Sequence, residues 1–264
     1  MTTVFFLFLF HLSVGVLATL PLVPESAGRS YFKFCSASSA FMTTAALWLL
    51  LRRFGVDGGP GVLGGEAYPW LVAAVSVCLV AGVLYNRARH FGWARLTRPL
   101  LWLALASGAA GIVAAAEGRA VVVATDLSST VLLGAAASAM VLGHWYLVVL
   151  DLPISALRRL TVLLIAALVV RSVVVGVALA GPVHGGYEDA TRVAAGLFSL
   201  DGVFVWMRVL FGLAGPLSLL WFIWKTVEIR STQSATGILY VQLFLVLAGE
   251  LLAKYLRVAA RLPL

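Results

Sequence analysis

The sequence predicts an all-α integral membrane protein. Of its 264 residues, 62% are hydrophobic and only 11% are charged, and the mean hydropathy is +1.02. A soluble domain carries about 25% charged residues, so the composition excludes a soluble fold. The apolar stretches are continuous and lack alternation with period two, which favours helices over a transmembrane β-barrel.

Eight apolar runs are each long enough to cross a hydrocarbon core of about 30 Å. Because little chain remains between them, we expect one transmembrane domain that covers residues 1–264. The expected helices are 4–22, 34–51, 68–85, 99–116, 127–150, 160–180, 204–224 and 237–256.

The first four helices contain few polar positions. His11 lies among Phe and Leu residues; we expect a hydrogen bond to a neighbouring helix, and a ligand role is the alternative. The second helix is rich in Ser and Thr, which favours close packing and interhelical hydrogen bonds. Pro99 is expected to begin the fourth helix, where proline is tolerated. Cys35 and Cys78 have no metal-binding or disulfide spacing and are expected to be buried as small apolar residues.

The second four helices carry more specific signals. The fifth helix contains a stripe of small residues, 134–139, which lets a partner helix approach closely. The sixth holds Arg171 near its middle, and we expect this cation to face the interior and to pair with Asp126 or Glu250. Pro216 is expected to bend the seventh helix.

The net charge of +8 would suggest a nucleic-acid partner in a soluble protein, but in this chain it reflects the placement of basic residues in alternate connections. By the positive-inside rule these connections are cytoplasmic, which predicts both termini on the non-cytoplasmic side. We therefore expect lipids and no nucleic acid as partners, and the basic segment 86–95 is expected to bind anionic head groups or to orient the chain. The basic residues on this side are Arg29, Lys33, Arg87, Arg89, Arg95, Arg98, Arg158, Arg159, Lys225 and Arg230.

Ionisable residues inside the last apolar runs point to a buried cluster. Arg208 and Glu250 lie on consecutive antiparallel helices, each about 8 Å inside the same face at 1.5 Å per residue. An unpaired charge at that depth is costly, so we expect the two side chains to meet. Asp126, Arg171 and Lys254 are expected to reach the same region, with His11 and Trp206 at similar depth.

Such a cluster can exchange protons with a quinone head group. In this hypothesis Glu250 and Asp126 are the catalytic proton acceptors. The cofactor-binding candidates are Arg208, Arg171, His11, Trp206 and Lys254. A transported ion and a purely structural ion-pair network are the alternatives.

Haem and metal chemistry are not expected within this chain. His11 and His144 fall about 10 Å and about 25 Å below the outer face, which is too far apart for one haem plane. The sequence contains no metal-binding repeat and no nucleophile with an adjacent base.

Two stretches near the C-terminus resemble the NrfD-like membrane anchors of dimethyl sulfoxide reductase and polysulfide reductase. They are Trp206-Met207-Arg208-Val209-Leu210, and Leu247-Ala248-Gly249-Glu250-Leu251 followed by Lys254. The resemblance covers about the last fifth of the chain, and the family's His-Leu-Gly-x-Pro stretch is absent. It implies two four-helix bundles in a bacterial inner membrane, a menaquinone or ubiquinone site near the outer face, and iron-sulfur or cytochrome subunits as partners.

The function expected from these observations is that of a membrane subunit of a respiratory electron-transfer complex. It either carries a quinol site or scaffolds the redox subunits. The alternatives are a small-solute or ion transporter, which predicts inverted repeats with paired broken helices, and an accessory subunit without chemistry of its own.

Overall fold

A computed structural model of the chain describes residues 1–57, 67–149, 152–180 and 200–259. The first half contains α1 (Thr2–Thr19), the short 3₁₀ turns η1 (Leu20–Leu22) and η2 (Glu25–Ala27), α2 (Gly28–Asp57), α3 (Ala67–Phe91) and α4 (Ala94–Ala115). The second half contains α5 (Ala120–Val148), α6 (Ser155–Ala180), α8 (Leu200–Val209), the π-helical turn η3 (Leu210–Ala214), α9 (Gly215–Glu228) and α10 (Thr232–Ala259). Within these residues eight helical spans are long and apolar enough to cross a membrane, which confirms the predicted fold class.

The helices extend beyond the apolar runs from which they were predicted. The second begins at Gly28 rather than at residue 34, because a helical backbone continues into the interfacial region where polar residues are tolerated. The prediction that Pro99 begins the fourth helix was wrong, since α4 begins at Ala94 and Pro99 lies inside it. The backbone carbonyl that loses its partner there belongs to Arg95, which is exposed close to the helix start.

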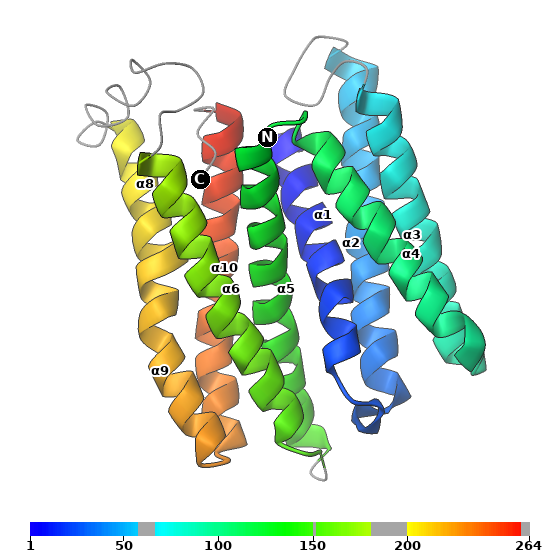
Figure 1. Ribbon diagram of the computed structural model, residues 1–264, viewed down its shortest axis with the longest axis vertical. Coiled ribbons are helices and arrows are strands. Elements are labelled where there is room, and N and C mark those ends of the chain that lie inside the picture. The colour runs from blue at the N-terminus through cyan, green and yellow to red at the C-terminus, as the bar shows by residue number, and fades with distance from the viewer. Residues whose placement is uncertain (58–66, 150–151, 181–199, 260–264) are drawn as a thin grey trace.

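The eight spans form two groups of four (Figure 1). In the first group α1 packs on α2, α2 on α3, α3 on α4 and α4 on α1; in the second α5 packs on α6, α6 on α9, α9 on α10 and α10 on α5. Helix α1 joins the groups because it also contacts α5 and α10. This is the expected arrangement of two four-helix bundles.

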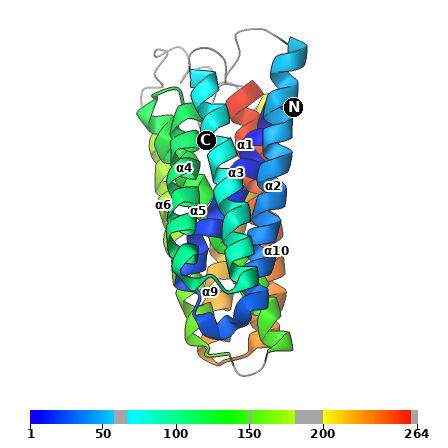
Figure 2. The same ribbon diagram turned by 90° about the vertical axis from the view of Figure 1, so that its right-hand side faces the viewer.

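The start of α1 and the end of α10 lie at one end of the molecule, here called the terminal end (Figure 1). Figure 2, seen from the side of α2, α3 and α4, shows the helices running along the long axis between the two ends. The opposite end carries the connections α1–α2, α3–α4, α5–α6 and α9–α10, and with them the basic residues named above; it is called the basic end. An even number of spans requires both termini on one side of a membrane.

Helices α1 and α5 cross at close range, as the small-residue stripe predicted. A Cβ atom at Gly134 would collide with the backbone of Gly15. One turn along both helices, the hydroxyl groups of Thr19 and Ser138 form a hydrogen bond. The crossing fixes α1 against the second bundle, and this sets the position of His11, one turn from Gly15.

The expected packing of the second helix is also confirmed. The hydroxyl of Ser13 on α1 lies 2.9 Å from that of Ser39 on α2 and also bonds Thr43. Cys35 and Cys78 are buried and free, as predicted.

Candidate functional site: a buried ion-pair cluster between the bundles

Helix α10 presents three ionisable side chains on one face. Glu250, Lys254 and Arg257 follow one another at spacings of four and three residues, so they line one stripe of the helix. All three are at most 4% exposed. Because α10 packs against α1, α5 and α8, this stripe faces the charged residues of those helices.

Glu250 binds two arginines at once. Arg171 on α6 donates from Nε to Oε1 at 2.9 Å and from Nη2 to Oε2 at 3.0 Å. Arg208 on α8 donates from Nη2 to Oε1 at 2.8 Å, and the Ser129 hydroxyl on α5 donates to Oε2 at 2.6 Å. We call these four residues the Glu250 site; each carboxylate oxygen accepts two hydrogen bonds, and all four side chains are fully buried.

Asp126 on α5 binds the other two cations. Lys254 Nζ donates to Oδ1 at 3.0 Å, and Arg257 Nη1 donates to Oδ2. Arg257 also donates from Nη2 to the backbone carbonyl of Ala115, the last residue of α4, at 2.8 Å. We call Asp126, Lys254, Arg257 and the neighbouring His11 the Asp126 site; it ties α10 to the first bundle.

His11 reaches the cluster from α1 but forms no hydrogen bond. Its Nδ1 lies 4.0 Å from Oδ1 of Asp126, and neither ring nitrogen has a partner although the side chain is fully buried. The expected hydrogen bond to a neighbouring helix was therefore wrong. Both oxygens of Asp126 are already bound by Lys254 and Arg257, and 4.0 Å exceeds hydrogen-bond reach.

The helix that carries Arg208 is interrupted directly after this residue. The π-helical turn Leu210–Ala214 follows it, and Pro216 lies at the start of α9. A Cβ atom at Gly212 would collide with Nη1 of Arg208, so this glycine makes room for the guanidinium. Gly249 on α10 faces Gly212 at the same crossing, and π turns are frequent at functional sites.

The structure brings most of the predicted residues together. The Arg208–Glu250 contact is confirmed, and Arg171 pairs with Glu250 rather than with Asp126. Lys254 pairs with Asp126.

One predicted residue lies elsewhere. Trp206 was expected in the cluster, but its side chain is 47% exposed and so is not enclosed there. Trp206 and Arg208 are two residues apart on one helix, which turns their side chains in different directions.

Sequence reasoning missed Arg257 and Ser129. Arg257 lies one residue beyond the last predicted helix, 237–256, and was not assigned to the cluster, yet its spacing from Glu250 and Lys254 places it on the same stripe. Ser129 stood among several hydroxyl residues of α5, and no signal distinguished it.

The cluster holds more positive than negative charge. Among the described residues it contains four cations and two carboxylates, a surplus of two positive charges with His11 neutral. Charges buried at membrane depth are costly unless they are compensated. The surplus therefore favours a negatively charged ligand or proton exchange at the cluster.

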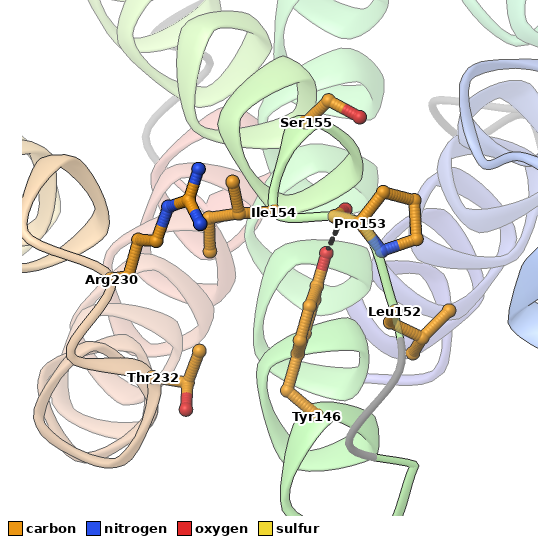
Figure 3. Close-up of a pocket in the computed structure, with 7 residues that line it drawn as sticks. All are labelled: Tyr146, Leu152, Pro153, Ile154, Ser155, Arg230 and Thr232. Carbon is orange, nitrogen blue, oxygen red and sulfur yellow. Dashed lines mark hydrogen bonds between the residues drawn. The ribbon is translucent and has the colours of Figure 1, made fainter.

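A separate hollow of about 480 Å³ lies at the basic end (Figure 3). The hydroxyl of Tyr146 donates to the carbonyl of Pro153 at 2.6 Å there, and Arg230 lies across the hollow on the α9–α10 turn. Nearby, His144 is exposed and bonds the Tyr240 hydroxyl at 3.1 Å. These residues lie at the end opposite to the chain termini, far from the cluster.

Ser129→Ala is expected to lower the free energy of unfolding by about 1.5 kcal/mol, because Glu250 loses a charge-assisted hydrogen bond and an oxygen stays buried without its full complement of donors. Denaturant unfolding in detergent micelles measures this change. Ser218→Ala is the control, since the exposed Ser218 hydroxyl bonds the Gly215 carbonyl of its own helix. Equal losses in both variants would contradict the assigned role of Ser129.

No protein-family model matches the sequence. A search of curated proteins finds no match either.

Proposed function

We propose that this chain is the membrane subunit of a respiratory electron-transfer complex in a bacterial inner membrane. It anchors iron-sulfur or cytochrome subunits, and its buried cluster carries a menaquinol or ubiquinol site. In this proposal both termini face the non-cytoplasmic side. The support comes from the C-terminal resemblance to NrfD-like anchors and from the state of one side chain, His11.

His11 is the observation that carries the proposal. In a buried imidazole both ring nitrogens normally form hydrogen bonds, and in His11 neither nitrogen has a hydrogen-bond partner. A quinone carbonyl or quinol hydroxyl is a suitable partner, because imidazole both donates and accepts hydrogen bonds. The residue also lies on α1, the helix that joins the two bundles, where a head group entering between the bundles would arrive.

A bound quinol supplies two electrons and two protons. His11 is placed to accept a proton at a ring nitrogen, and the Asp126 carboxylate 4.0 Å away stabilises the resulting imidazolium. Lys254 and Arg257 hold Asp126 in position from the other side. In the proposal Asp126 and Glu250 are the next proton acceptors, and Arg171 and Arg208 position Glu250.

His11→Leu is expected to abolish quinol-driven electron transfer while leaving the protein folded. Leucine has a similar volume, and the substitution removes a buried polar group that has no hydrogen bond to lose. The complex is purified with its partner subunits, and reduction of a partner's redox centre by a soluble menaquinol analogue is followed spectroscopically.

His144→Leu is the matched control, because His144 is exposed at the basic end. Its rate is expected to stay within about twofold of the unaltered protein, since it lies outside the cluster. An unchanged rate of electron transfer in a folded His11→Leu complex would reject the quinol site. The chain would then be an accessory subunit that only anchors its partners. Purification without any redox subunit would reject the complex itself.

A small-solute or ion transporter is the second candidate. It is favoured by the π-helical turn of the α8–α9 span beside a cluster with surplus positive charge, since π turns are frequent at functional sites. Purified protein in liposomes distinguishes the two: the transporter moves ions without partner subunits, and the electron-transfer subunit does not.

A further inference from the structure

We infer that the cluster holds one small monovalent anion at Arg208, and that chloride is suited to this site. The inference starts from the hydrogen-bonding state of the Arg208 guanidinium. Its Nη2 donates to Glu250, but Nε and Nη1 have no partner although the side chain is fully buried. A buried guanidinium with unused donors points to an acceptor near it.

The cluster itself does not supply that acceptor. Both oxygens of Glu250 already accept two hydrogen bonds each, and both oxygens of Asp126 are bound by cations. Arg257 also has an unpartnered Nε, so the deficit of acceptors extends along α10. A ligand that brings acceptor capacity is therefore needed rather than a rearrangement of the two carboxylates.

The charge surplus distinguishes an anion from water. An ordered water molecule accepts hydrogen bonds from unused donors, but it leaves the charge unchanged. One bound anion reduces the surplus of two positive charges to one, which lowers the cost of keeping the cluster out of water. Electrostatics therefore favours the anion.

The local backbone favours a small anion. Gly212 in the π turn and Gly249 on α10 leave no side chain beside Nη1, so the guanidinium lies against two stretches of backbone. The side chains around Arg208 are fully buried, and a weakly hydrated monatomic anion gives up less solvation than a sulfate or phosphate on moving among them. Chloride binding at Arg208 does not require a bound quinol, whose proposed hydrogen-bond partner is His11.

The test measures thermal unfolding of the purified full-length protein in a non-ionic detergent. Sodium chloride is titrated against sodium gluconate at constant ionic strength. Chloride is expected to raise the unfolding midpoint by about 3 °C with saturation, because a ligand that binds the folded state stabilises it. Arg208→Gln is expected to remove this difference. Arg159→Gln removes an exposed arginine near the basic end and is expected to keep it.

Bromide provides a second measurement that needs no variant. Crystals of the unaltered protein grown in sodium bromide are expected to show an anomalous peak within hydrogen-bond reach of the Arg208 guanidinium, about 3.3 Å from one of its nitrogens. Equal midpoints in chloride and gluconate, a chloride response that survives in Arg208→Gln, or the absence of a bromide peak at Arg208 would each overturn the inference.

Discussion

Glu250→Gln is expected to lower the free energy of unfolding by about 3–5 kcal/mol, the cost of removing one partner from a buried ion pair. The substitution keeps the volume of the side chain but leaves Arg171 and Arg208 facing a neutral amide inside the bundle. Their guanidinium groups remain fully buried and have no other carboxylate within their site. Unfolding by sodium dodecyl sulfate in mixed micelles, followed by tryptophan fluorescence, measures the loss.

Glu228→Gln is the matched control. Glu228 forms a 2.8 Å ion pair with Lys225, but both side chains are about half exposed, and surface pairs of this kind contribute little. No measurable change is expected. A triple variant, Glu250→Leu with Arg171→Leu and Arg208→Leu, is expected to recover part of the loss, because it removes both guanidinium charges of the Glu250 site together with their carboxylate. Similar unfolding midpoints for Glu250→Gln and Glu228→Gln would contradict the assigned geometry.

Gly134→Ala is expected to lower the free energy of unfolding by about 3 kcal/mol, at the upper end for an overpacked core. The added Cβ collides with the backbone of Gly15, which cannot move away as a flexible side chain would. Helices α1 and α5 must therefore separate. The separation also moves His11, so the same variant is expected to slow quinol-driven electron transfer.

Gly176→Ala tests whether the effect comes from the crossing rather than from the residue type. A Cβ at Gly176 on α6 meets nothing within 4 Å. Alanine has the higher helix propensity, so this control is expected to be neutral or slightly stabilising. The same destabilisation at both glycines would rule out the helix crossing as its cause.

Composition and run length determined the fold class. Eight apolar runs in a chain with 11% charged residues indicate a membrane protein, and their continuity favours helices, which satisfy every backbone group within one segment, over a barrel. The Arg208–Glu250 contact was predicted from the depth of the two residues below the same membrane face. Each residue advances a helix by about 1.5 Å, so counting from the ends of two antiparallel helices locates both side chains at one level.

The direction in which each side chain points around its helix axis was decided only by the tertiary structure. Lipid-facing and core-facing positions are both apolar here, so the sequence shows no polar stripe from which to read how each helix is turned. For this reason Trp206 was expected in the cluster but lies partly exposed, and Arg257 was not assigned to the cluster but binds Asp126.

Two further properties of the site also required the packed structure. The identity of each carboxylate's partners depends on which helices are neighbours, and Arg171 had two candidates until α6 and α10 were placed. The unpartnered state of His11 depends on α1 crossing α5 at Gly15 and Gly134, which holds the imidazole 4.0 Å from a carboxylate whose oxygens are already bound. The sequence by itself determined the class of the protein and the depth of its charges. The tertiary structure decided which charges meet and which donors remain unused, because these depend on contacts between segments far apart in the chain.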